Sequence, residues 1–302
     1  MAGPTVTYLT PPRLASLPVE WEQLEYSSRA IAFAADGRRR MRAWGPPERP
    51  WVLSVEARGD RWRVEAWGAD PASARAAARA MFSLDHPLER FYRLVRREPV
   101  LRGTERRFRG LRLPRDANLY EALLHAIVGQ QLSVVAANAI ARRLLRATDA
   151  FLSADGVEVP CPPAPARLAR LGADGLRALG MSRAKAQAIV ALASDAAGVA
   201  EDAATALVDP LPRAIDRLIA RPGVGRWTAE NALLRGVGRP DVFVGGDLGI
   251  RVALAEYGVV PRHASEEVAR AWSERWYPGW GSYATLYLWR KLVSDRARAA
   301  GG

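Results

Sequence analysis

The chain has 302 residues, of which 49% are apolar, so it can form two or three globular domains with a sizeable buried core. Cys161 is the only cysteine and the three histidines lie far apart, which excludes a disulfide framework and a cysteine-ligated zinc or iron–sulfur site. We find neither a signal-peptide pattern nor an apolar run long enough to span a bilayer, and we therefore expect a cytoplasmic protein.

Basic residues dominate the charge. The chain has 44 lysines and arginines against 32 aspartates and glutamates, a formal net charge of +12, and Lys185 and Lys291 are the only lysines. The preference for arginine can reflect a GC-rich genome, but codon bias alone does not produce the excess over acidic residues. This balance favours a polyanionic partner.

Short segments of alternating apolar and polar residues dominate the N-terminal third of the chain, which is the pattern of a half-buried antiparallel sheet. In one of them Trp62, Val64 and Ala66 share a face. Pro71 then begins an alanine-rich helix that we expect to reach about Phe82 and to pack on the sheet. The predicted strands cover residues 26–33, 38–44, 51–57 and 61–67.

Arginine is frequent between Arg93 and Arg115. A surface that binds a polyanion has this composition, and so does an ordinary solvated helix face. The sequence leaves both interpretations open.

From Asp116 onward the periodicity is helical. Leu119, Leu123 and Ile127 form the apolar stripe of a first helix, and Ser133 caps the next one. The first helix is predicted over 116–129, the second reaches about Thr148, a proline-rich loop covers 159–165, and further helices cover 165–171, 173–179, 182–198, 210–220, 226–236, 247–257, 265–276 and 281–298.

These patterns predict an α+β fold with two domains. A small N-terminal antiparallel sheet domain occupies residues 1–112, and an all-helical body occupies residues 113–302.

The segment Arg221-Pro-Gly-Val-Gly-Arg-Trp-Thr-Ala-Glu230 predicts two helices joined by a tight hairpin. Pro222 stops the first helix because it lacks an N–H, and Gly223 and Gly225 can take positive φ. The free N–H groups of the hairpin then lie at a helix N-terminus, where they can hold an anion such as a DNA phosphate. An ordinary helix–helix turn has the same Pro-Gly-x-Gly pattern. The tryptophan that follows it and the later Asp247 favour the phosphate site.

Together with Asp247, this segment resembles the helix-hairpin-helix DNA glycosylases, with the motif itself at about 210–236. Three further stretches resemble the 3-methyladenine DNA glycosylase II branch, and the four motifs keep the family's order and approximate spacing over residues 108–292. The stretches are Phe108-Arg-Gly-Leu-Arg-Leu-Pro114, Ala126-Ile-Val-Gly-Gln-Gln-Leu-Ser133, and Glu274-Arg-Trp-Tyr-Pro-Gly-Trp-Gly-Ser-Tyr-Ala284 closing on Leu288-Trp289.

The resemblance implies a monofunctional DNA glycosylase that flips out an alkylated base, of the 3-methyladenine or 7-methylguanine type, and releases it by hydrolysis in base excision repair. Asp247 stands where the family carries the carboxylate that stabilises an oxocarbenium-like sugar. Asp247 also begins a predicted helix, so an N-cap role is the alternative, and the two roles are compatible. Trp227 stands where lyase members carry a Schiff-base lysine, so no lyase activity is implied.

The resemblance also implies a pocket for the flipped base. Trp227 and Trp289 would line it, because an electron-rich indole face attracts a cationic alkylated purine. Asn231 and Leu248 stand in place of tyrosines that line some family pockets, and Val244-Gly245-Gly246 replaces a proline that often precedes the aspartate. These departures bear on the range of substrates.

The implied partner is double-stranded DNA with damaged bases, bound by a monomer. In the family the loop at Gln131 wedges into the minor groove and fills the gap left by the extruded nucleotide; a polar helix–helix turn is the alternative. No cofactor is implied for catalysis, and a monovalent cation is implied on the carbonyls of Ile219, Arg221 and Val224. The implied DNA-binding residues are Gly223, Val224, Gly225, Arg226, Thr228, Gln130, Gln131 and Leu132.

Two other functions remain as alternatives. A non-catalytic helix-hairpin-helix DNA-binding module needs neither Asp247 nor Trp227. A glycosylase for another damaged base, such as a bifunctional enzyme for oxidised bases, would need a lysine near the hairpin, and several such relatives have a four-cysteine cluster that a single cysteine cannot form.

Overall fold

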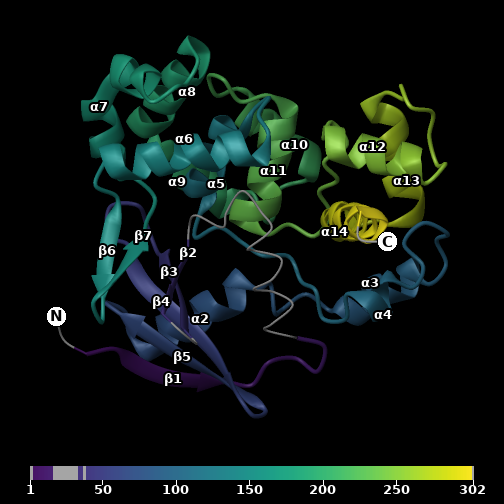
Figure 1. Cartoon of the computed structure of the whole chain (residues 1–302), viewed down its shortest axis with the longest axis horizontal. Helices are drawn as coiled ribbons and strands as arrows, with labels where there is room; N and C mark the ends of the chain where they lie inside the picture. Colours follow the sequence, from purple (N-terminus) through teal and green to yellow (C-terminus); the bar gives the residue numbers. More distant parts are fainter. Residues whose placement is uncertain (1–2, 16–32, 37–38, 301–302) are drawn as a thin grey trace.

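The computed structural model describes residues 3–15, 33–36 and 39–300 (Figure 1). An N-terminal sheet lies at one end of the molecule and a larger helical body lies beside it (Figure 1). The predicted α+β class is confirmed. Within the described ranges, no helix combines the length and the apolar character needed to cross a bilayer.

The N-terminal sheet has five antiparallel strands in the order β1-β5-β4-β3-β2. The predicted strands 51–57 and 61–67 are confirmed, and the prediction over 38–44 corresponds to β3. The prediction over 26–33 lies outside the described residues except for its last one, and the first strand is not predicted. The strands are β1 (Thr5–Leu9), β2 (Phe33–Asp36), β3 (Arg39–Trp44), β4 (Trp51–Arg58) and β5 (Arg61–Trp67).

Both faces of this sheet are covered. As the alternation predicts, Trp62, Val64 and Ala66 are buried in one cluster with apolar residues of the helix α2 (Pro71–Met81). The opposite face, with Trp67, packs against a hairpin of β6 and β7.

The hairpin corrects the prediction of an all-helical body. Its strands β6 (Phe151–Ala154) and β7 (Val157–Pro160) belong to the part of the chain predicted as helical and looped. Asp155 and Gly156 join them, both with positive φ, at 48° and 79°. Asp-Gly is the dipeptide that favours such a two-residue turn, so the signal was present in the sequence.

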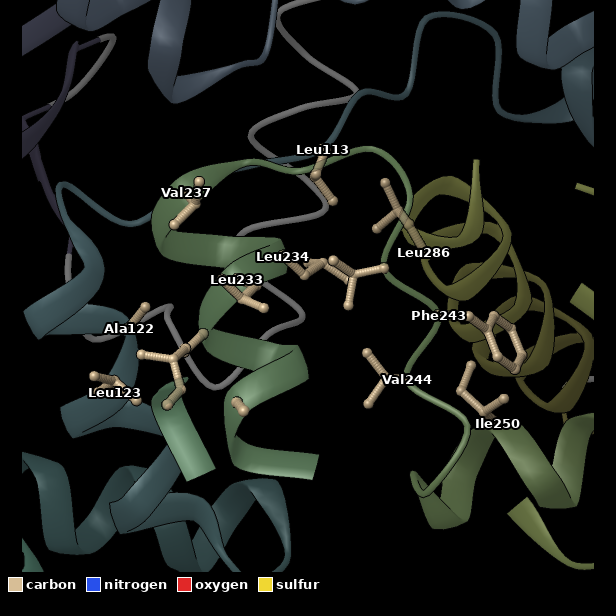
Figure 2. Close-up of a cluster of buried hydrophobic side chains, with 14 of the residues drawn as sticks. Leu113, Ala122, Leu123, Leu233, Leu234, Val237, Phe243, Val244, Ile250 and Leu286 are labelled. Atoms are coloured by element: carbon tan, nitrogen blue, oxygen red, sulfur yellow. The ribbon is translucent and has the colours of Figure 1, made fainter. Parts of the chain in front are cut away.

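The helical body forms one large buried cluster around α5 and α11. Figure 2 shows Leu233 and Leu234 between Leu123 of α5 and the loop that carries Val244. The helices are α3 (Leu88–Val95), α4 (Thr104–Arg107), α5 (Leu119–Gly129), α6 (Val134–Ala147), α7 (Pro165–Ala178), α8 (Arg183–Ser194), α9 (Ala196–Thr205), α10 (Leu211–Ile219), α11 (Arg226–Ala232) with a π-helical continuation at Leu233–Val237, α12 (Leu248–Glu256), α13 (Glu266–Trp276) and α14 (Gly281–Ala300).

Most helix predictions hold, with four differences. The helix predicted from residue 116 begins at Leu119, because Asn118 caps it. The predicted helix 182–198 ends at Ser194, and α9 begins separately at Ala196. The last turn of the predicted helix 226–236 is π-helical, and there a Cβ on Gly236 would lie 2.7 Å from the Cα of Leu119. The helices α3 and α4 are not predicted. The break between 171 and 173 is confirmed, since Gly172 has φ 64° and ψ 178°.

Arg42 of β3 links the sheet to the helical body. Its side chain is 1% exposed and pairs with Asp116 at 3.1 Å and with Glu121 at 3.0 Å. Arg42 also donates to the carbonyl oxygen of Arg115 at 2.8 Å. His125 lies near the same carboxylates, with Nδ1 at 3.7 Å from Oδ1 of Asp116, and Arg42 pairs with both of them, so the cluster is an ion-pair network. The core of the sheet domain ends at Leu84, and the predicted boundary at residue 112 stays a prediction.

The arginine-rich segment divides between both interpretations. Arg112 is buried and donates to the carbonyl oxygens of Ser83 at 3.1 Å and of His86 at 2.9 Å. Other arginines of the segment are exposed: Arg93, Arg96, Arg97, Arg102, Arg106 and Arg109.

Candidate functional site

Asp247 lies at the start of α12. As the pattern predicts, it is the N-cap residue, and its Oδ1 accepts a hydrogen bond from the backbone N–H of Ile250 at 3.1 Å. The residue is half-buried, so its carboxylate is held by the fold and still reachable from solvent.

Two tryptophans from distant elements meet on this carboxylate. The indole Nε1–H of Trp227, in the first turn of α11, donates to Oδ2 at 3.0 Å. The indole Nε1–H of Trp289, in α14, donates to Oδ1 at 3.0 Å. With the backbone bond of Ile250, three donors fix the orientation of one carboxylate. Both indoles are half-buried, so each keeps part of its surface available.

The other two predicted pocket residues have different surroundings. Asn231 is 6% exposed, and its amide Nδ2 donates to the carbonyl oxygen of Trp227 at 3.0 Å, one turn earlier in the helix. Leu248 is 68% exposed and follows Asp247 directly. Asn231 therefore stabilises the helical turn that begins at Trp227, and Leu248 lies exposed beside Asp247. Contact of either residue with a base stays a prediction.

The hairpin between α10 and α11 has one strained position. Gly223 has φ +72°, and a Cβ there would lie 2.3 Å from the Cβ of Ala188 in α8. Gly225 has φ −85° and open space around it, so the expectation of positive φ is wrong for this residue. The N–H of Val224 donates back to the carbonyl oxygen of Arg221 at 3.2 Å, which closes the turn.

The side chain of Arg221 does not face outward. It donates to Asp202 at 2.6 Å and 2.9 Å and also pairs with Asp195, which fixes the start of the hairpin to α9. The cation predicted on the carbonyls of Ile219, Arg221 and Val224 stays a prediction.

The loop between α5 and α6 is tied to the hairpin. The amide Nε2 of Gln130 donates to the carbonyl oxygen of Gly223 and to Oγ1 of Thr228, both at 2.9 Å. Gln131 has φ +54°, which is uncommon for a residue with a Cβ. Leu132 is 38% exposed. Gln131 and Leu132 are thus presented on a strained loop beside the predicted phosphate-binding turn.

Lys185 of α8 supports this loop, which the sequence does not reveal. Its Nζ donates to the carbonyl oxygens of Val128 at 3.0 Å and of Gln130 at 2.6 Å, and burial lowers the pKa of this lysine. We call the loop 130–133 between α5 and α6 the wedge loop, after its predicted role. The helix α8 therefore contacts the wedge loop through Lys185 and the hairpin through Ala188.

We expect Lys185→Gln to loosen the wedge loop, because two carbonyl oxygens at the end of α5 lose their shared donor; the cost is about 1–2 kcal/mol. Hydrogen exchange of the amides at 130–132 should become faster. Lys291→Gln is the control, since Lys291 pairs with Asp295 on α14 instead. Unchanged exchange in the Lys185 variant would show that the loop does not depend on this contact.

Glu230 is the most buried carboxylate near the site. It is 1% exposed and accepts hydrogen bonds from Arg226, the first residue of α11, and from Arg270 of α13. Burial raises the pKa of Glu230, and the two arginines oppose that shift. The Arg226 side chain itself is 54% exposed, so part of it remains available at the hairpin.

Comparison with known proteins places the site in a family. A family model described as HhH-GPD superfamily base excision DNA repair protein matches residues 124–278, which include the wedge loop, the hairpin and Asp247. A solved 3-methyladenine DNA glycosylase from Archaeoglobus fulgidus superposes with a TM-score of 0.81 at 22% identity, covering 96% of this chain and 98% of the other; this similarity concerns the fold.

Two curated relatives are similar in sequence. DNA-3-methyladenine glycosylase 2 of Escherichia coli is 35% identical over 180 residues, which are 60% of this chain and 60% of that protein. A Mycobacterium tuberculosis protein whose name pairs transcriptional activation with DNA repair is 32% identical over 224 residues, 74% of this chain and 43% of the relative. The chain thus spans only part of the length of these relatives.

Proposed function

The chain belongs to the HhH-GPD superfamily of base excision DNA repair proteins, in its 3-methyladenine DNA glycosylase II family, and we propose that it is a monofunctional DNA glycosylase for alkylated bases. Its substrate would be double-stranded DNA with a 3-methyladenine or 7-methylguanine type of lesion. The single observation that carries the proposal is the Asp247 carboxylate, held by the N–H groups of Trp227 and Trp289 at 3.0 Å each.

The reaction requires a fixed negative charge beside the sugar. As the bond between C1′ and the base lengthens, positive charge develops on the sugar, and a carboxylate aimed at it stabilises the transition state. The three donors on Asp247 hold it in place before the substrate arrives, so little reorganisation is needed. The electron pair of the broken bond leaves with the alkylated purine, which becomes neutral, and water adds to C1′ and releases a proton.

The two indoles suit a cationic leaving base. Trp227 and Trp289 each donate an indole N–H to Asp247, which holds that edge of each ring beside the carboxylate. A half-buried indole face attracts a cation by about 1–2 kcal/mol. The pocket should therefore bind cationic alkylated purines more tightly than neutral normal bases.

DNA binding would use the hairpin and the wedge loop. Phosphate would approach the N–H groups of Gly223 and Gly225 with Arg226 beside them, and Gln131 would fill the space of the flipped nucleotide. We propose a monomer acting on nucleoid DNA in the bacterial cytoplasm, with no cofactor in the reaction and a structural monovalent cation at the hairpin.

The direct test is release of free bases from methylated double-stranded DNA, followed by mass spectrometry. We expect 3-methyladenine or 7-methylguanine in solution with the wild-type protein and none with Asp247→Asn. A wild-type protein that binds the DNA tightly but releases nothing would be the non-catalytic binding module.

We also expect no lyase activity, because Trp227 cannot form an imine and both lysines are engaged elsewhere. Lys185 donates to two carbonyl oxygens and Lys291 pairs with Asp295. Borohydride reduction during turnover on lesion DNA should therefore trap no covalent protein–DNA adduct. Any adduct would favour a bifunctional enzyme for another damaged base.

A further inference from the structure

The loop 242–247 carries the Asp247 carboxylate and has two supports. On one side α14 contributes hydroxyl groups: Ser282 accepts from the N–H of Val242 at 3.1 Å, and Thr285 accepts from the N–H of Val244 at 3.2 Å. On the other side lies the guanidinium of Arg270, from α13.

Arg270 connects the loop to two helices. It donates to the carbonyl oxygen of Phe243 at 3.1 Å and to Oε2 of Glu266 at 2.8 Å, and it pairs with Oε1 of Glu230 in α11. Its side chain is 15% exposed, and the Glu230 side chain is 1% exposed. Arg270 therefore joins α11, through Glu230, to the backbone of the loop that carries Asp247, through the carbonyl oxygen of Phe243.

The two glycines before Asp247 make this contact possible. A Cβ on Gly245 would lie 2.7 Å from Cγ of Arg270, and a Cβ on Gly246 would lie 3.0 Å from Oε2 of Glu266. The ion pair of Arg270 with Glu266 thus packs directly against the loop backbone at Gly245 and Gly246. A side chain at position 245 would displace Arg270, whereas one at position 246 would meet only the end of the Glu266 side chain, which is 46% exposed and can give way.

We propose that Arg270, together with Glu230 and Glu266, is a positioning residue. It holds the loop so that Asp247 keeps accepting the hydrogen bonds of the Trp227 and Trp289 indole N–H groups. Glu230 lies in the same short helix as Trp227, so one guanidinium fixes the carboxylate's loop relative to one of its two donors. The effect on the reaction rests on the proposed glycosylase function; the effect on the geometry of Asp247 does not.

The test compares Arg270→Gln with Arg275→Gln, the same change on the same helix at an exposed arginine that lies over Trp276. We expect Arg270→Gln to slow single-turnover base release about 10²-fold, since a displacement on the order of 1 Å has that cost. Affinity for abasic-site DNA should stay within about threefold, because Arg270 donates to Phe243, Glu266 and Glu230 and reaches the hairpin only through the side chain of Glu230. Arg275→Gln should change neither quantity.

A second readout does not depend on activity. The protein has 10 tryptophans, and the indole N–H signals of Trp227 and Trp289 can be assigned in nitrogen–proton NMR spectra from Trp→Phe variants. Arg270→Gln should move these two signals, because their acceptor shifts, and Arg275→Gln should not. If the wild type releases no base but the signals move, the positioning role stands and the proposed function fails.

A double-mutant cycle tests the contact itself. Gly245→Ala should slow base release by pushing on Cγ of Arg270, and combining it with Arg270→Ala, which removes that atom, should slow release far less than the product of the two effects. Independent, multiplicative effects would contradict the proposal.

The remaining outcomes are also decisive. A folded Arg270→Gln protein with wild-type rate and wild-type indole signals overturns the proposal, and so does a slow protein whose two signals have not moved. If Arg270→Gln does not fold, Glu266→Gln decides: its side chain is 46% exposed, and a shift of the two indole signals supports the proposal while unchanged signals overturn it.

Discussion

We expect Asp247→Asn to lower the single-turnover rate of base release by at least about 10³-fold, close to 4 kcal/mol of transition-state stabilisation. Affinity for DNA with an abasic site should stay near that of the wild type or rise, because a negative charge is removed beside a polyanion. The two quantities are measured on the same lesion duplex, in single-turnover and equilibrium-binding experiments.

The geometry explains why asparagine is a poor substitute despite its similar shape. Its Oδ1 can still accept from Ile250 and from Trp289, but its NH₂ group would face the N–H of Trp227, where two donors oppose each other. Asp216→Asn is the matched control, since Asp216 is an exposed carboxylate on α10 and the change in net charge is the same. A variant of Asp247 that keeps more than about a tenth of the wild-type rate would contradict its catalytic role.

The second large effect concerns the hairpin. Gly223→Ala should destabilise the protein by about 2–4 kcal/mol, the sum of a positive φ and a steric clash. The new Cβ would lie 2.3 Å from the Cβ of Ala188, so the hairpin must move away from α8. We therefore expect at least about tenfold weaker binding of abasic-site DNA by the folded fraction.

Gly225 supplies the control for this prediction. Gly225→Ala adds the same methyl group where nothing lies within 4 Å and φ is −85°, so the stability of the protein should not change. Gly225→Asp then isolates charge, and it should weaken binding with a strong dependence on salt. If Gly223→Ala and Gly225→Asp both bind DNA as tightly as the wild type, the hairpin is only a turn between helices.

Local sequence signals predict the parts of the fold that depend on neighbouring residues. Ser133 and Asp247 begin their helices as the capping pattern indicates, and the alternation in β5 predicts its buried face. Such features are determined within a few residues, where backbone N–H groups and side-chain oxygens meet.

The supports of the site depend on contacts between distant segments, which one sequence does not reveal. Lys185 reaches the end of α5 across 55 positions of the chain, and Arg270 reaches Glu230 across 40. Gly225 resembles Gly223 in sequence, yet only the packing of α8 against the turn decides which of them needs positive φ. The roles predicted for the base pocket and for the DNA contacts await the experiments above.

The buried ion pairs of Arg42 with Asp116 and Glu121 have a consequence for fragments of the chain. A fragment cut to the matched span 124–278 omits all three residues, but one that starts at residue 113 keeps both carboxylates and loses their guanidinium. Two negative charges would then stand at the N-terminal end of α5, the helix that leads to Gln131, without the counter-ion that makes their burial tolerable. The sheet domain therefore supplies a counter-ion to the helical body, and we expect a fragment that begins upstream of β3 to be more stable than one that begins at residue 113.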